Sequence, residues 1–546
     1  MYNASKDAFV CQVTFKRSNV VATAGHNTVQ QLTSEPQFTR SDTRIAELLD
    51  QMTTIMSLGA LSSLAAWDMN TQMPEGAGEM RGSQMAVMQG ILHDKWVDKQ
   101  LGKLIQDLAP VVQQSSYTDA DRGLVRVALR NYEQSTKLPR TLVEEMARNE
   151  ATSFEAWRKA RANNDFASFA PSLARTVALQ REVADFFGYT ESRYDALLDI
   201  YEPGLTTSRV DALFAPVRSI SSALLQRIQQ GSNTVDTAPL EGEFAVDKQV
   251  QLCTDILKAM GYDFTHGAIA QSPHPFTINM GAPFDVRVTV RANTHLLQQS
   301  IMAAIHEGGH ALYEQGSAAT LANTPVVGGA SMGIHESQSR LWENAVGRSV
   351  PFWQGQYHLV REAFPDKYAN IDAAAFARAL NHVEPSLIRV EADEVTYNLH
   401  IIIRFELEKQ MINGEVSVES LPRLWNEKYK EYLGIQSETD SDGILQDVHW
   451  TSGFGYFPTY TIGNLCAAQI LHTLYKAIPD LDERLAKGDT ATLLTWLREH
   501  LYQYGAIYLP DELMRRVTGE PLDSSYFLKY LTGKFEQVYG LGGTSK

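Results

Sequence analysis

Residues 301–316, IMAAIHEGGHALYEQG, contain the pattern His-Glu-x-x-His, with His306, Glu307 and His310. On a helix, residues four positions apart lie one turn apart on the same face, so both imidazoles can bind one metal ion. Glu307 then projects beside them, close enough to take a proton from a water molecule on that ion. Zinc suits such a site because it accepts neutral imidazole and lowers the pKa of its bound water to about 7. The pattern therefore predicts metal-assisted hydrolysis.

The residues that flank this pattern are those of a buried helix, with MAAI before it and Ala311 and Leu312 after it. Buried histidines and glutamates need partners, because desolvation otherwise opposes their presence. Gly308 and Gly309 are unusual inside a helix, where each costs about 1 kcal/mol. Small residues at these positions allow a neighbouring backbone or a substrate to come close, and close helix packing explains them equally well.

A third metal ligand is expected from a second helix further along the chain. Glu336 lies 336 − 310 = 26 residues after His310. This interval allows the first helix to end, a loop to turn and a second helix to return past the metal. Glu336 is therefore the expected third ligand, and His335 and Glu343 are the alternatives.

The hydrophobic period changes over residues 274–291, HPFTINMGAPFDVRVTVR. Polar and β-branched apolar residues alternate strictly over residues 285–291, which indicates a strand with one buried face. Together with FTINM before it, this stretch predicts a small hairpin or sheet just before the His-Glu-x-x-His helix. The strand could pair with an extended peptide, or it could be an ordinary sheet edge with a protective charged face.

Two irregular segments downstream combine polar, aromatic and glycine residues, which favours loops at a cleft, although a packed aromatic loop has a similar composition. These segments are 385–400 with Arg389 and Asp393, and 442–464 with Gln446, Asp447, His449, Tyr456 and Tyr460.

Most of the remaining chain has helical patterns. They cover roughly 43–69, 80–108, 119–136, 139–161, 164–187, 208–229, 246–261, the second half of 323–347 with Ser331 as a candidate N-cap, 352–364, 370–382, 394–412, 418–433, 460–477 and 489–503. Apolar residues in these stretches recur at intervals of three and four, which predicts helices that bury one face. The fold class is therefore expected to be mainly α.

Composition excludes several classes of protein. The 546 residues include 48 basic and 64 acidic ones, a net charge of −16 that argues against binding to nucleic acid or to anionic membranes. No apolar run approaches the ~20 residues of a membrane span. Three widely spaced cysteines suit a reducing compartment, so a cytoplasmic location is expected. Residues 1–35 lack the long apolar segment of a secretory signal, and residues 1–40 are expected to be disordered or an extension, with an organelle-targeting segment as the alternative.

Six motifs resemble, in their order, those of the carboxypeptidase Taq (M32) family of zinc metallocarboxypeptidases. They are HPF (274–276), DVRVT (285–289), HEGGH (306–310), HESQ (335–338), IRVEAD (388–393) and GILQDVHW (443–450). WDMNTQMP (67–74) is also similar to the N-terminal region of this family. The resemblance spans about residues 40–540, so residues 41–546 are expected to form one catalytic domain.

The resemblance implies a single large helical fold of the gluzincin type, with a deep substrate groove and a small β-sheet near the metal. It implies a homodimer that removes single C-terminal residues from peptides with broad preference. Zinc is the implied cofactor, and the sequence does not show whether Co²⁺ or Mn²⁺ replaces it.

The resemblance also implies roles for single residues. His306, His310 and Glu336 would bind the metal, and Glu307 would act as the general base. Arg389 would bind the C-terminal carboxylate of the substrate. His449 and a tyrosine from 456–460 would face the scissile carbonyl. Tyr460 is preferred for this role by its distance past His449, and Tyr456 is then expected to contact the substrate.

Two other functions remain open at this point. An endo-acting zinc oligopeptidase would share the metal site and would need no cationic anchor at one end of its groove. A non-catalytic scaffold would use the histidine cluster only for structure, and the intact Glu307 argues against it.

Overall fold

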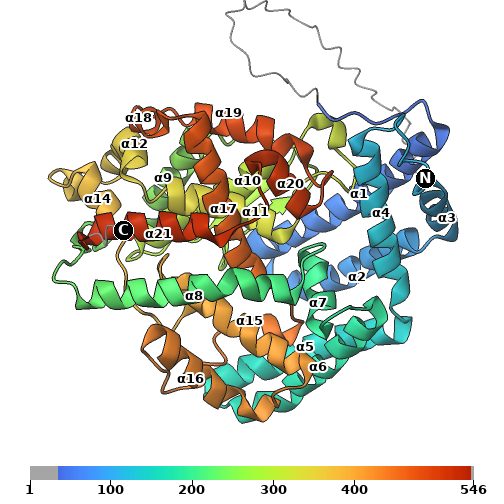
Figure 1. Ribbon diagram of the computed structural model, residues 1–546, viewed down its shortest axis with the longest axis horizontal. Helices are drawn as coiled ribbons and strands as arrows, with labels where there is room; N and C mark the ends of the chain where they lie inside the picture. The colour runs from blue at the N-terminus through green and yellow to red at the C-terminus, as the bar shows by residue number, and fades with distance from the viewer. Residues whose placement is uncertain (1–34, 543–546) are drawn as a thin grey trace, which may run out of the picture. The chain divides into compact units, whose positions relative to one another are not determined.

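Helix α10 (Leu297–Gln315) carries the His-Glu-x-x-His pattern and lies among other helices in the computed structural model (Figure 1). The structure describes residues 35–542, so most of the expected extension over residues 1–40 lies outside the described residues. The described residues form one compact unit by their internal contacts. The expectation of a mainly helical fold with a small sheet is confirmed.

The helices before the sheet follow the predicted pattern, with two exceptions, one of which is the unpredicted helix over residues 193–201. They are α1 (Thr43–Thr71), α2 (Gly78–Trp96), α3 (Lys99–Leu108), α4 (Asp119–Lys137), α5 (Arg140–Asn163), α6 (Phe166–Phe187), α7 (Arg193–Tyr201), α8 (Thr207–Gln230) and α9 (Val246–Met260). The prediction of a single helix over 80–108 is wrong, because α2 ends at Trp96 and α3 begins at Lys99. Asp98 caps α3 there by accepting from the backbone N–H groups of Gln100 and Leu101.

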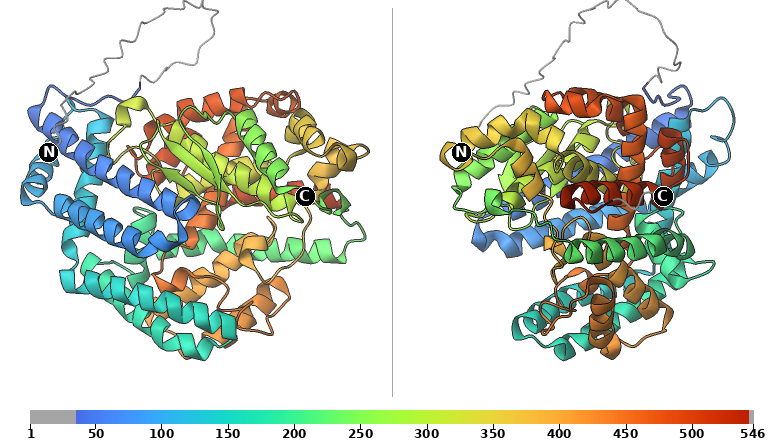
Figure 2. Two further views of the ribbon diagram at one scale, coloured as in Figure 1. Left: turned by 180° about the vertical axis from the view of Figure 1, so that it is seen from behind. Right: turned by 60° about the vertical axis from the view of Figure 1, so that its left-hand side comes forward.

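Three short strands form a mixed sheet in the order β1-β3-β2. Strand β2 (Thr277–Asn279) runs antiparallel to β3 (Val286–Val290), and β1 (Ile269–Gln271), which the sequence pattern did not predict, runs parallel to β3. The expectation that the valine-rich strand forms a sheet edge is wrong, because β3 is central and its valines are fully buried. Strand β3 packs on α10, and Figure 2 shows the sheet beside α1 and α2.

Helix α11 (Met332–Arg340) packs on α10, and α17 (Pro458–Ala477) packs on α11. Ser331 caps α11, as predicted, by accepting from the backbone N–H of Ile334 at 3.1 Å. A Cβ on Gly309 would lie 2.6 Å from the carbonyl oxygen of Gln338, and one on Gly308 would lie 2.6 Å from a methyl group of Leu257. Close helix packing therefore explains both glycines of the motif.

The remaining helices surround this centre. They are α12 (Val350–Ala363), α13 (Pro365–Tyr368), α14 (Ala373–Ala379), α15 (Tyr397–Asn413), α16 (Leu421–Leu433), α18 (Leu481–Ala486), α19 (Ala491–His500), α20 (Pro510–Thr518) and α21 (Ser524–Tyr539). The sequence patterns did not predict α7, α13, α18, α20 or α21, and the first four are shorter than the window in which helical periodicity can be recognised. Within residues 35–542, no helix is both long and apolar enough to cross a membrane.

Candidate metal centre and substrate site

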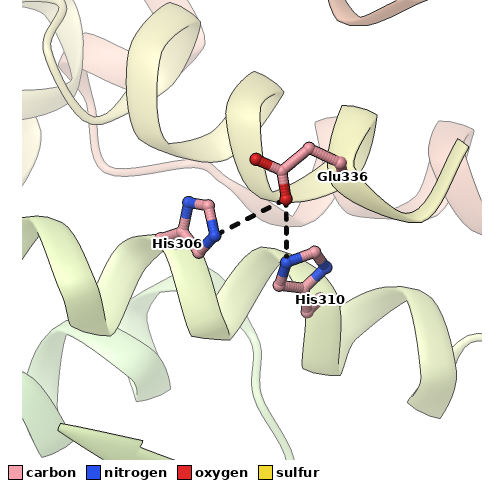
Figure 3. A group of neighbouring side chains, drawn as sticks. All are labelled: His306, His310 and Glu336. Carbon is pink, nitrogen blue, oxygen red and sulfur yellow. Dashed lines mark ion pairs between the residues drawn. The ribbon is translucent and has the colours of Figure 1, made fainter. Parts of the chain in front are cut away.

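The side chains of His306, His310 and Glu336 meet between α10 and α11 (Figure 3). One ligand atom from each lies within 4.8 Å of the other two. The Oε2 atom of Glu336 is 3.7 Å from Nε2 of His306 and 3.3 Å from Nε2 of His310. Two imidazoles and one carboxylate form a set of donors that fits a zinc ion with a further position open.

The other ring nitrogen of each histidine already has a partner. Nδ1 of His306 lies 2.8 Å from Oε2 of Glu343, and Nδ1 of His310 lies 2.6 Å from Nδ1 of His335. When Nδ1 of each histidine carries the proton, its Nε2 keeps a lone pair that is directed toward Glu336. A neutral histidine needs such a lone pair to bind a metal ion. Glu343 and His335, the alternative third ligands, therefore orient the two histidines instead of joining the group of three.

Arg340 holds both carboxylates of this region. Its Nε donates to Oε1 of Glu336 at 2.6 Å, and its Nη1 donates to Oε2 of Glu343 at 3.2 Å. Burial opposes the charge on Glu343, but Arg340 and His306 more than offset it and lower the pKa of Glu343 to about 2. Both carboxylates are thus ionised at neutral pH. Arg340 was not among the predicted site residues, although its position four residues after Glu336 on one helix was a usable signal.

The carboxylate of Glu307 is 7 % exposed and has a hydroxyl partner. Thr277, at the start of β2, lies 2.7 Å from its Oε2 atom and can donate to it. Burial raises the pKa of Glu307 above its usual value, and the neighbouring His306 opposes this shift. A carboxylate with a raised pKa is a better proton acceptor for catalysis near neutral pH. Thr277 gave no signal in the sequence, since only the fold brings the sheet onto α10.

The two irregular segments predicted at a cleft lie against each other. The side-chain oxygen of Gln446 accepts from the backbone N–H of Arg389 at 2.9 Å. Asp447 lies 3.1 Å from Nε and 2.9 Å from Nη2 of Arg389, and it also accepts from Nε of Arg404 at 2.7 Å. The guanidinium groups of Arg389 and Arg404 share this one carboxylate, so the cluster of the three side chains keeps a surplus positive charge. Arg404 has no recognisable signal in the sequence.

Asp393, from the first of these segments, has a structural role. Its carboxylate accepts from the backbone N–H groups of Val395 and Thr396 at 2.8 and 3.1 Å. These bonds hold the turn that leads into α15, so Asp393 is not a member of the candidate site.

The predicted aromatic residues form one cluster beside Arg389. The ring of Tyr456 lies 5.3 Å from the ring of Tyr460 and 6.0 Å from that of His449, and Tyr460 lies 5.3 Å from the Arg389 guanidinium carbon. Burial, opposed by Asp447, lowers the pKa of His449 to about 4, so this ring is neutral at pH 7. Burial raises the pKa of Tyr456, and the charge on Glu336 raises it further. The aromatic cluster therefore lies within electrostatic range of the histidine–glutamate group.

Known proteins are similar to this chain over most of its length. The family model described as Carboxypeptidase Taq (M32) metallopeptidase matches residues 47–535. Thermostable carboxypeptidase 1 of Thermus thermophilus is 40% identical over 88% of this chain and 96% of its own length. Carboxypeptidase 1 of Bacillus subtilis is 37% identical over 90% and 98%. The crystal structure of the M32 carboxypeptidase from Deinococcus radiodurans matches 91% of this chain and all of its own, with a TM-score of 0.88 and 37% identity.

Proposed function

Because this chain belongs to the carboxypeptidase Taq (M32) family of metallopeptidases and is a metallocarboxypeptidase, we propose that it removes single C-terminal residues from peptides at a zinc site formed by His306, His310 and Glu336. The observation that carries this assignment is the convergence of their three ligand atoms within 4.8 Å. When bound, zinc would activate water and polarise the scissile carbonyl. The donor set is less suited to Mg²⁺, which prefers oxygen ligands, than to Co²⁺ or Mn²⁺ as substitutes.

In the proposed mechanism, Glu307 takes a proton from the attacking water and delivers it to the leaving amine. The hydroxyl of Thr277 holds its carboxylate in place. His449 and Tyr460 donate hydrogen bonds to the oxyanion that develops on the substrate, each contributing about 2–4 kcal/mol. Tyr456, whose ring lies 5.3 Å from that of Tyr460 in the same cluster, is an alternative to it.

Arg389 is proposed to bind the C-terminal carboxylate of the substrate. Of the five N–H groups of its guanidinium, the one on Nε and one on Nη2 contact Asp447, and one on Nη1 contacts Tyr397. One N–H on each of Nη1 and Nη2 thus has no hydrogen-bond partner among residues 35–542. Two such groups can bind both oxygens of a carboxylate, which gives strength and orientation.

Replacing Arg389 by Ala is expected to lower kcat/KM for a free-acid peptide by roughly 10²-fold, the effect of losing a charged, two-point contact. The wild-type protein is expected to cleave the same peptide with an amidated C-terminus slowly, and this rate is expected to change little in Arg389→Ala. Arg389→Lys keeps the charge without the planar fork and is expected to be intermediate. Arg378→Ala, at an exposed arginine, is the control. If the wild-type protein cuts amidated and free-acid peptides equally well, the carboxylate anchor is wrong.

Digestion of one free-acid decapeptide, combined with metal analysis, tests the activity as a whole. A ladder of products, each shorter by one residue, is expected, together with about one zinc per chain. An early internal cut would support the endo-acting oligopeptidase instead. A chelator is expected to abolish turnover, and a protein that unfolds under chelation without having had peptidase activity would support a purely structural cluster.

We further propose that the protein is a homodimer whose interface includes the exposed apolar side chains of α1 and α2. Among the described residues these helices expose Leu61, Leu64, Met69, Met80, Val87 and Ile91. In α2 no residue is buried, and Val87 is 65% exposed. Apolar patches of this kind often mark protein–protein contacts.

The double change Val87→Glu and Ile91→Glu is expected to convert the dimer to a monomer, because it places two charges in the proposed interface. Light scattering coupled to size-exclusion chromatography would measure the mass. Val143→Glu, at an exposed valine of α5, is the control and is expected to leave the dimer intact. A wild-type mass of one chain, or a double variant that stays dimeric, contradicts this interface.

A cytoplasmic location is also proposed. It is supported by the two cysteines within the described residues, Cys253 and Cys466, which are free and buried. Buried free thiols are typical of proteins in a reducing compartment.

A further inference from the structure

We infer that Tyr397 is a positioning residue that connects the metal centre to the subsite for the substrate carboxylate. This inference rests on the proposed function, because it assumes the roles given there to Glu336 and Arg389. Tyr397 is the first residue of α15, its side chain is 7% exposed, and it lies eight residues after Arg389. Its ring and its hydroxyl contact two different arginines, and each arginine belongs to a different part of the site.

The ring of Tyr397 covers Arg340. The guanidinium carbon of Arg340 lies 4.3 Å from the centroid of the Tyr397 ring, which is a close cation–π contact. The same guanidinium donates to Glu336 and to Glu343, the partner of His306. The ring therefore restricts the cation that orients one proposed metal ligand directly and a second one through Glu343.

The hydroxyl of Tyr397 contacts Arg389. It accepts from Nη1 of Arg389 at 3.2 Å, on the opposite end of the guanidinium from the contact between Nε and Asp447. The guanidinium is thus held at two places, and its remaining N–H groups have a fixed direction. Tyr397 also lies edge-on to Tyr460, with ring centroids 6.3 Å apart.

The ring and the hydroxyl oxygen of a tyrosine form one rigid unit, because the oxygen is bonded directly to the planar ring, and only two torsions place this unit relative to the backbone. Contact with Arg340 at the ring and with Arg389 at the hydroxyl therefore sets the separation between the metal centre and the carboxylate anchor. In an enzyme that cuts one residue from the end, this separation selects the bond that reaches the nucleophile. Tyr397 would accordingly support cleavage of a single residue at a time.

Two substitutions separate the contacts of Tyr397. Tyr397→Phe keeps the ring over Arg340 and removes the hydroxyl, so KM for a free-acid peptide is expected to rise about 3- to 10-fold. Its kcat is expected to stay within about twofold, because the chemical step keeps its groups. Release of metal to a chelator is expected to stay at the wild-type rate. Tyr397→Leu removes both contacts, and we expect metal to be released about 10-fold faster or more in addition to the higher KM.

The control is Tyr357→Phe. Tyr357 is also 7% exposed and makes a hydroxyl contact of 2.7 Å, to the carbonyl oxygen of Ile371, outside the candidate site. The Tyr357→Phe variant is expected to leave KM and metal release unchanged. Thermal unfolding would show that this variant and the two variants of Tyr397 are folded.

An unchanged KM in Tyr397→Phe would overturn the connection to the carboxylate subsite. Wild-type metal release in folded Tyr397→Leu would overturn the connection to the metal centre. Failure of the proposed function gives a different result, since Arg389→Ala would then leave the preference for free-acid peptides intact.

Discussion

Changing Glu307 to Gln is expected to lower kcat by about 10²–10⁴-fold with the metal content unchanged. The amide has nearly the shape of the carboxylate and can still contact Thr277, so the local structure is expected to persist. It cannot accept a proton from the attacking water, and no other carboxylate in the described part of the chain has been assigned that role. Turnover of a free-acid peptide and metal content by mass spectrometry are the two measurements.

Glu362→Gln is a matched control, because Glu362 is an exposed glutamate of α12. It is expected to retain wild-type turnover. Wild-type turnover in Glu307→Gln would remove Glu307 from the mechanism. Loss of metal in this variant would show that its turnover falls because the metal site is damaged and not because the general base is missing.

Replacing Glu336 by Ala is expected to deprive the protein of stoichiometric metal and of measurable turnover. The carboxylate supplies one of the three converging ligand atoms and carries the negative charge of the set. Burial opposes this charge, but Arg340 and the two histidines lower the pKa of Glu336 well below its usual value. The site therefore holds an ionised carboxylate across the pH range of an ordinary assay. Metal content after dialysis, followed by titration with zinc, measures the loss.

Glu343→Ala distinguishes a direct ligand from a residue that orients one. Because Glu343 contacts the far nitrogen of His306, its loss is expected to weaken metal binding by about 10- to 100-fold and not to abolish it. Glu336→Gln, which keeps the packing around Arg340, guards against a general loss of structure. If Glu343→Ala empties the site and Glu336→Ala does not, the third ligand has been assigned to the wrong glutamate.

Helix and strand formation followed local patterns in most of the chain. The helical period over residues 43–69 became α1, and the change of period near residue 285 became β3. The position of β3 in the sheet could not be predicted, since β1 has only three residues and its pairing with β3 depends on the fold. The break between α2 and α3 was missed because the pattern continues through it.

The amino-acid sequence by itself determined the helix that carries two of the proposed metal ligands, since two histidines four residues apart on one helix share a face without any other element. It also indicated Glu336 through its interval from His310, and Arg389, His449 and the two tyrosines through two irregular segments and through motifs in a familiar order. Contacts between distant segments were decided by the tertiary structure. Thr277 beside Glu307, and Tyr397 between Arg340 and Arg389, are examples. The physical reason is that a helix face is fixed by local backbone geometry, whereas the partner of a buried charge is whichever side chain the packing of other elements brings within hydrogen-bonding distance.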